Sequence, residues 1–210
     1  DVTHIWGTEH LHSYGMTETA KITGLSAKTI ISIQGLVSVY SQHFMAGLPH
    51  KVQNIGSIRD YFRNDTLKMQ NKKMRKRGEY EIRSVKNVSH VIGRTNWDYI
   101  CVKQINENVV YHHNNEILRS TFYNHIWNID DCNKYSIFTS QAQHPIKGFH
   151  VLLKAVKIIS NKYKNTRLYV AGVRNPMRHT IRSTRYESYI YNLAKKYGIL
   201  DNIVYVGNLS

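Results

Sequence analysis

The feature that most limits the fold of this chain is a regular alternation between short apolar runs, rich in β-branched residues, and longer segments of helical periodicity. Such alternation is typical of a parallel sheet whose strands are joined by crossover helices. We interpret as strands the runs 2–6, 29–33, 88–92, 109–111, 135–139, 167–171 and 203–206. These strands are too many for one small unit, so the sequence predicts an α/β protein of two units, each with a parallel sheet.

A polar stretch separates the fourth predicted strand from the fifth. It contains His112, His113 and the two asparagines that follow, and ends near Asp130 and Asp131. We place the domain junction there, which gives a first domain of 1–130 and a second of 131–210. The first predicted strand starts directly after Asp1 and no helix follows the last one, so we expect both domains to be incomplete and the chain to be an internal piece of a longer protein.

Two helices are expected in the second domain. The first has an apolar stripe that can cover a sheet face while its lysines stay in water; the stripe consists of Phe149, Leu152, Leu153, Val156 and Ile159. The second runs from about Glu187 to Tyr197 and ends at Gly198, a residue suited to a left-handed helix cap. Together they predict a β-α-β-α-β order across 135–206.

Composition excludes several classes of protein. Hydrophobic residues make up 41% of the 210 residues, which is too many for a disordered polyelectrolyte. The two cysteines cannot build a disulfide framework, and no apolar run is long enough to cross a bilayer, so we expect a cytoplasmic protein. The formal net charge of +15 favours a polyanion, a phosphorylated ligand or an anionic lipid surface as partner.

Polar residues follow most of the predicted strands, where open parallel sheets bind their ligands. One such loop is most often an ordinary turn, but several together favour a cleft. The residues concerned are Gly7, Glu9, His10, Gln34, Gly35, Arg94, Gln141, Gly172 and Arg174.

The segment from Pro145 to Gly148 begins the helix that carries the Phe149 stripe. Free backbone N–H groups and the positive end of the helix dipole attract anions, and Lys147 adds a full charge. The segment therefore suits a phosphate, although a proline-initiated helix with an exposed lysine is the commoner meaning of such spacing. Neither a Walker-type phosphate loop nor a dinucleotide fingerprint occurs.

Three runs in the second domain resemble the first half of the donor domain of family-four retaining glycosyltransferases, also described as glycosyl transferases group 1. They are Ser136 to Ala155, Leu168 to Gly172, and Tyr197 to Leu209. Parts of the first domain, Asp1 to Gly7, Ile31 to Leu36 and Ser89 to Thr95, are similar to the second half of the acceptor domain.

The resemblance implies a GT-B enzyme with two Rossmann-like domains. Such an enzyme would transfer a sugar, with retention, from a nucleotide-sugar to a saccharide or lipid-linked acceptor, in polysaccharide or glycolipid synthesis. The resemblance implies that Lys147 and Gly148 hold the donor diphosphate and that neither a metal nor another cofactor is needed. The family's paired glutamates would lie beyond Ser210, so we expect this chain alone to be inactive and to bind nucleoside diphosphate weakly.

The sequence departs from the family pattern in two places. The family often has Gly-Arg where this chain has Gln141-Ala142, and His-Gly where it has Gln34-Gly35. Arg174 either substitutes for the missing arginine or is a solvated loop residue. The later arginines Arg178, Arg182 and Arg185 either serve the donor phosphates or lie in a disordered stretch. A glutamine binds hydroxyls but cannot act as acid or base at neutral pH.

On the acceptor side, Glu9 and His10 are candidates, with a helix-capping glutamate and a surface histidine as the ordinary alternatives. The histidines show no metal-ligand spacing. The basic segment Lys68 to Arg77 is expected to form a helix that either rests on an anionic membrane surface or is simply solvated.

Two other functions stay open. A basic nucleic-acid-binding protein would suit the charge and the fifteen tyrosines, but these are scattered and no recognition motif accompanies them. We therefore expect no nucleic-acid partner. A non-catalytic glycosyltransferase paralogue is compatible with the two departures at Gln34 and Gln141-Ala142.

Overall fold

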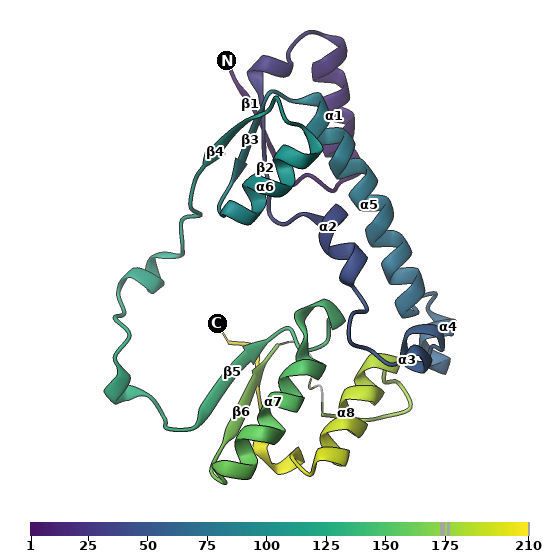
Figure 1. The fold of residues 1–210 in the computed structure, drawn as a ribbon, viewed down its shortest axis with the longest axis vertical. Helices are drawn as coiled ribbons and strands as arrows, with labels where there is room; N and C mark the ends of the chain where they lie inside the picture. Colours follow the sequence, from purple (N-terminus) through teal and green to yellow (C-terminus); the bar gives the residue numbers. More distant parts are fainter. Residues whose placement is uncertain (173–174, 176, 210) are drawn as a thin grey trace. The chain divides into compact units, whose positions relative to one another are not determined.

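The computed structural model describes residues 1–172, 175 and 177–209. The chain divides into two compact units, each with its own parallel sheet (Figure 1). Unit 1 comprises Asp1–His43 and Asn71–His125, and unit 2 comprises Phe44–Gln70 and Ile126–Ser210. The mixed α/β class with parallel sheets is the one that the alternating pattern predicts.

Unit 1 contains a sheet of strand order β1-β2-β3-β4, in which all neighbouring strands are parallel. Its elements are β1 (Thr3–Trp6), α1 (Leu11–Ile22), η1 (Ser26–Lys28), β2 (Thr29–Ser32), α2 (Val37–Tyr40), η2 (Ser41–His43), most of α5 (Leu67–Asn87), β3 (His90–Gly93), α6 (Asn96–Ile105), β4 (Val110–His113) and η3 (Ser120–Tyr123). The first four predicted strands are confirmed, with small shifts at their ends.

The core of unit 1 lies between the sheet and the helices α5 and α6. Ile31 of β2 and Val91 of β3 are neighbours across the sheet and are fully buried. Val85 of α5 and Val102 of α6 belong to the same buried cluster. Burial of these β-branched side chains fixes the strand register, because a shift of one residue would turn them to the opposite face of the sheet.

A buried carboxylate holds α2 in place within unit 1. Glu81 of α5 is 0% exposed, and it accepts hydrogen bonds from the amides of Val37 and Ser38 at 3.1 and 2.8 Å. The hydroxyls of Thr8 and Ser38 donate to it as well. Desolvation raises the pKa of Glu81, although these donors oppose the shift. The carboxylate thus caps a helix whose own N-cap residue, Leu36, has no polar side chain.

Unit 2 contains a sheet of order β5-β6-β7, again parallel. Its elements are α3 (His50–Asn54), α4 (Ile58–Phe62), η4 (Ile129–Asp131), β5 (Ser136–Ser140), η5 (Pro145–Lys147), α7 (Phe149–Lys162), β6 (Arg167–Ala171), α8 (Arg185–Tyr197), η6 (Leu200–Asn202) and β7 (Ile203–Gly207). The remaining three predicted strands and both predicted helices are present.

Helices α7 and α8 lie side by side on one face of this sheet (Figure 1). Phe149, Leu153 and Val156 of the predicted stripe are buried, whereas Leu152 and Ile159 are only half-buried. His150 and Ser160 are buried in their place. The buried face is therefore rotated from the prediction, because it must also accommodate α8. That helix ends as expected at Gly198, with φ 65°.

The segment Phe44–Gln70 packs with unit 2, although it lies within the range 1–130 that we assign to the first domain from sequence. Two buried polar groups account for this placement. His150 of α7 is hydrogen-bonded to the carbonyl of Ala46 and to the Tyr186 hydroxyl, both at 3.1 Å. Burial lowers the pKa of His150, which favours the neutral ring that can serve both partners. The predicted junction near residue 130 lies close to the division at His125.

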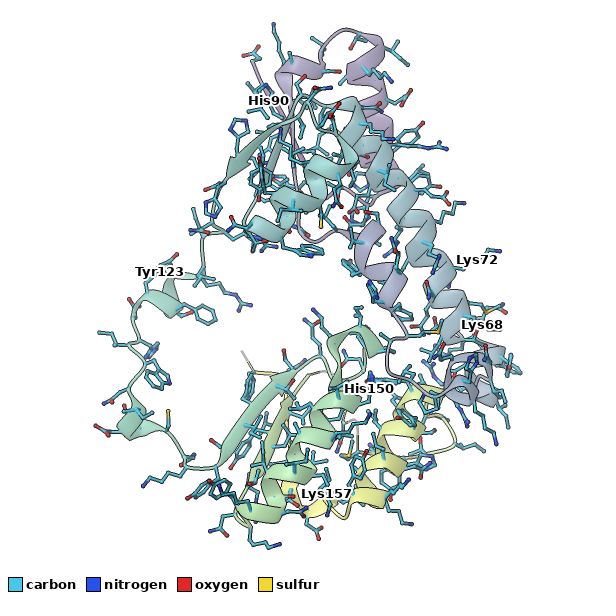
Figure 2. All side chains as sticks on the ribbon, in the orientation of Figure 1. Lys68, Lys72, His90, Tyr123, His150 and Lys157 are labelled. Atoms are coloured by element: carbon cyan, nitrogen blue, oxygen red, sulfur yellow. The ribbon has the colours of Figure 1, made fainter. Side chains whose placement is uncertain are left out.

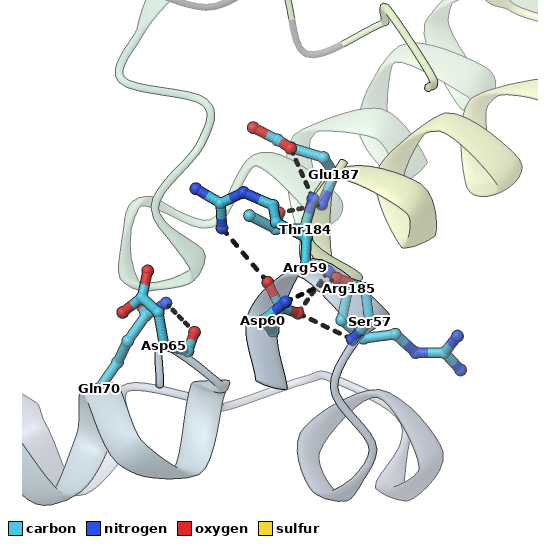
Figure 3. A network of polar contacts seen from close by, with 8 residues as sticks. All are labelled: Ser57, Arg59, Asp60, Asp65, Gln70, Thr184, Arg185 and Glu187. Carbon is cyan, nitrogen blue, oxygen red and sulfur yellow. Dashed lines mark hydrogen bonds and ion pairs between the residues drawn. The ribbon is translucent and has the colours of Figure 1, made fainter. Parts of the chain in front are cut away.

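The second group is the carboxylate of Asp60 on α4 (Figure 3). Its side chain is 2% exposed. Its Oδ2 accepts from the amide of Ser57 at 2.9 Å and from the amide of Arg185, the first residue of α8, at 2.8 Å. One carboxylate therefore caps two helices that are far apart in sequence.

Across the described residues, none of the helices combines the length and the apolar character that crossing a bilayer requires.

Candidate functional site

Unit 1 has a pocket of about 470 Å³ at the carboxyl ends of its strands. Trp6 ends β1, Gln34 follows β2, Arg94 follows β3, and Asn114 to Ile117 follow β4. Four chain segments thus meet at one sheet edge, as parallel topology requires. Among the sequence candidates, the structure brings Gln34 and Arg94 together here.

Arg94 organises this pocket. Its guanidinium forms an ion pair with Glu116 at 2.8 Å and donates to the backbone oxygen of Gln34 at 3.1 Å. Its own amide donates to Asp98, which caps α6 together with Thr95. The arginine therefore links three strand-end loops, and its charge is already shared with a carboxylate. This favours a neutral, hydroxyl-rich ligand over a phosphate in this pocket.

Trp6 is the largest apolar group in the pocket and is 62% exposed. It packs against His4, with ring centroids 4.6 Å apart and ring planes tilted by 33°, and His4 is hydrogen-bonded to the Ser32 hydroxyl at 2.6 Å. An exposed aromatic face beside amide groups is suited to stacking on a sugar ring. The sequence analysis did not single out Trp6, and its position at the end of a predicted strand is the signal that could have done so.

The other first-domain candidates do not line this pocket. The Glu9 carboxylate and the His10 ring lie 3.2 Å apart next to Gly7, and Gly35 lies against Tyr40. Burial, together with the carboxylates of Glu9 and Glu81, raises the pKa of Tyr40 to about 12. Gln34 and Arg94 thus line the pocket, whereas Gly7, Glu9, His10 and Gly35 do not.

In unit 2, the loop after β5 has the backbone of a glycine-rich turn. Gln141 adopts φ 57° and Gly148 adopts φ 70°, both in the left-handed region that favours glycine. The family that this chain resembles often has glycine at the position of Gln141. The backbone of this chain therefore makes the left-handed turn with a glutamine in place of that glycine. Ala142, where the family has arginine, is 2% exposed and supplies no charge.

Lys147 ends the short 3-10 turn η5, and α7 begins only after Gly148. This corrects the expectation that Pro145 starts the long helix, because the left-handed Gly148 interrupts it. The Lys147 ammonium is exposed and has no hydrogen-bond or ion-pair partner in the part of the chain that the structure describes. A Cβ at Gly148 would meet no heavy atom within 4 Å, so the backbone there is open to a ligand.

His144 stands beside this lysine. Desolvation, and to a smaller extent the Lys147 charge, lower the pKa of His144. The neutral imidazole can donate or accept one hydrogen bond without repelling the ammonium. The pair thus combines the positive charge of Lys147 with the neutral ring of His144, which can donate or accept a hydrogen bond.

Two glycines lie at the same edge of the sheet: Gly172 follows β6, and Gly207 is the last residue of β7. The amide of Gly172 donates to the carbonyl of Gly207 at 2.9 Å, and Gly172 faces the Gln141 to Gln143 loop. The Tyr205 hydroxyl donates to the Gly172 carbonyl and borders a pocket of about 620 Å³ that also contains Arg178 and Arg182. Of the donor-side candidates, Arg174 lies outside the described residues, so its role stays a prediction.

The basic segment Lys68 to Arg77 is helical, as predicted, and forms the first half of α5. Its lysines and arginines are all exposed, and Lys68 and Lys72 project from the helix in Figure 2. Whether they contact a membrane stays a prediction.

Residues 121–210 match the family model described as glycosyl transferases group 1. The match covers β5, β6 and β7 together with the Lys147 loop. No curated protein matches the chain. The family match supports a glycosyl-transfer function for the second part of the chain, and so a sugar donor and an acceptor as substrates.

Proposed function

We propose that the chain is part of a GT-B, family-four retaining glycosyltransferase, in which unit 2 holds the diphosphate of a nucleotide-sugar and unit 1 holds the acceptor. The observation that carries the proposal is the Lys147 ammonium, which has no partner among the described residues and lies beside the open backbone of Gly148, within the region that matches group 1 glycosyltransferases. Lys147 and Gly148 are the positions at which the resemblance places diphosphate binding.

The chemistry of sugar transfer suits these groups. When the bond between the anomeric carbon and the diphosphate breaks, negative charge grows on the departing oxygen, and a fixed cation stabilises it. Lys147 supplies that cation, and the amides of Phe149 and His150, which make no hydrogen bond with other described residues, add partial positive charge. We propose that these groups perform the role of a metal ion, so that none is required.

We further propose a saccharide or lipid-linked acceptor and a place in polysaccharide or glycolipid synthesis at the cytoplasmic face of a membrane. The pocket around Trp6 supports an acceptor with sugar hydroxyls, because the side-chain amides of Gln34, Asn114 and Asn115 line it without a partner among the described residues.

Replacing Lys147 with glutamine is expected to raise the pKa of His144, because the substitution removes the positive charge that lowers it. Addition of a nucleoside diphosphate is expected to raise this pKa in the unmodified chain as well, since the bound anion favours the imidazolium. An NMR titration of the His144 ring measures both effects. The nucleotide effect should disappear in the Lys147→Gln chain.

Lys164→Gln is the matched control, because Lys164 is exposed in unit 2 and does not contribute to the His144 shift. A nucleotide effect of equal size in both variants would contradict diphosphate binding at Lys147. We expect weak binding by this chain alone, so the titration should use millimolar nucleotide.

Replacing Trp6 with alanine is expected to weaken the binding of an oligosaccharide acceptor by about tenfold, since stacking and burial of an aromatic ring are lost. Calorimetric titration with candidate oligosaccharides measures the change. Trp97→Ala provides the control, because Trp97 is also partly exposed in unit 1 but does not line the pocket. Equal losses in the two variants would argue against an acceptor site at Trp6.

A further inference from the structure

Unit 2 exposes a compact apolar patch that neither proposed substrate explains. Phe62 is 91% exposed, Ile181 87% and Ile58 78%. These side chains line one hollow of about 670 Å³ together with Arg59, Arg63 and Arg182. We refer to these six residues as the apolar-arginine patch.

The patch has a fixed architecture. Ile58 and Phe62 are four residues apart on α4, so they occupy the same helix face. Asp60 of α4 accepts from the amide of Arg185, and this bond holds α4 against the start of α8 (Figure 3). Ile181 and Arg182, a few residues before α8, line the same hollow as Ile58 and Phe62. Segments more than a hundred residues apart therefore present one surface. The hydrogen bond between Asp60 and Arg185 therefore holds the backbone that carries these exposed apolar side chains.

The charged side chains of the patch are all positive. Arg63 and Arg182 are exposed, and their guanidinium groups have no partner within the described part of the chain. Arg59 is paired with the buried Asp60. Among the described residues, no acidic side chain lines the hollow. Two free cations thus flank three exposed apolar side chains.

This combination fits a bilayer surface that contains anionic lipid. Apolar side chains can enter the boundary between headgroups and acyl chains, while neighbouring arginines bind lipid phosphates. A second copy of the chain fits less well, because a two-fold interface would bring the same arginines together. The chain's net charge of +15 adds long-range attraction to the same surface.

We propose that the apolar-arginine patch is a docking site for anionic membranes, with Phe62, Ile58 and Ile181 inserted and Arg63 and Arg182 on lipid phosphates. The site differs from the basic segment Lys68 to Arg77, which carries charge but only Met69 as an exposed large hydrophobic residue. The proposal does not depend on glycosyl transfer.

Flotation with vesicles of phosphatidylcholine and about 30% phosphatidylglycerol tests the proposal on the full chain. The double substitution Phe62→Ser with Ile181→Ser is expected to lower the partition coefficient by at least about tenfold, because two large apolar side chains no longer enter the bilayer. Ile126→Ser is the matched control, since Ile126 is 96% exposed in the same unit and outside the patch. It should bind as the unmodified chain does.

The charge contribution is tested with Arg63→Gln and Arg182→Gln together, for which we expect about a fivefold loss per arginine. Lys164→Gln with Lys196→Gln removes the same charge from exposed positions elsewhere in unit 2 and should have a smaller effect. A fluorophore attached through Phe62→Cys, in a chain carrying Cys132→Ser, should brighten on anionic vesicles, whereas one attached through Ile126→Cys should not.

Several outcomes would overturn the proposal. They are equal binding by the Phe62/Ile181 variant and the Ile126 control, equal binding to purely neutral vesicles, and an unchanged fluorophore at position 62. A vesicle-free dimer that the Phe62/Ile181 variant abolishes, seen by analytical ultracentrifugation, would assign the patch to a second copy instead. If only changes at Lys72, Lys73 and Arg75 to Arg77 reduce binding, the membrane contact lies on α5 rather than on the patch.

Discussion

Replacing Glu81 with alanine is expected to lower the free energy of unfolding by about 2–4 kcal/mol, because buried donors lose their acceptor. The amides of Val37 and Ser38 and the hydroxyls of Thr8 and Ser38 all donate to this carboxylate. Glu81 is 0% exposed, and Gly78, one turn earlier, lets Ser38 pack against α5. Chemical denaturation monitored by circular dichroism measures the change.

Glu79→Ala is the control for this experiment, because Glu79 is exposed on the same helix. It should change the stability by less than about 0.5 kcal/mol. Equal losses in the two variants would mean that the carboxylate of Glu81 does not hold α2.

The pH dependence of Glu81 has a defined sign. Its pKa is raised in the folded chain, so the folded state binds its proton more tightly than the unfolded state does. This contribution to stability is present below the unfolded pKa of about 4.3 and is lost as pH rises through the folded pKa. The stability advantage of the unmodified chain over Glu81→Gln should therefore be larger near the unfolded pKa than at neutral pH. An advantage that grows with pH would contradict the raised pKa.

Replacing Asp60 with alanine is expected to cost about 2–3 kcal/mol, because the amides of Ser57 and Arg185 lose a shared charged acceptor. The loss should loosen 44–70 from the rest of unit 2. Hydrogen exchange of peptides from this segment and from the start of α8 should accelerate together.

Asp60→Asn should be milder than Asp60→Ala, because an amide oxygen can still accept from both backbone groups. Asp65→Ala is a suitable control, since the Asp65 side chain makes no hydrogen bond with other described residues whereas its backbone oxygen accepts from Gln70. Faster exchange confined to α4, with α8 unchanged, would show that Asp60 does not connect the two helices.

The sequence predicts only some of the residues that line the candidate sites. Lys147, Gly148 and Gln141 are close in the chain, and all three lie in the segment between β5 and α7, but their role in diphosphate binding stays a prediction. Gln34 and Arg94 were both chosen from strand-end positions, and parallel topology brings them together. Trp6 and Glu116 were missed, since no local pattern distinguishes an exposed tryptophan from a core one or reveals an ion pair between two loops.

The sequence by itself determined the α/β class, all the strands of both described sheets and the helices α7 and α8 with the Gly198 cap. These features depend on periodicity and on residues within a few positions of each other. Only the tertiary structure decided that Phe44–Gln70 joins unit 2, that Glu81 and Asp60 cap helices distant in sequence, and that Phe62 and Ile181 form one surface. The physical reason is that a desolvated carboxylate or an exposed apolar side chain is defined by its neighbours in space, and these come from remote parts of the chain.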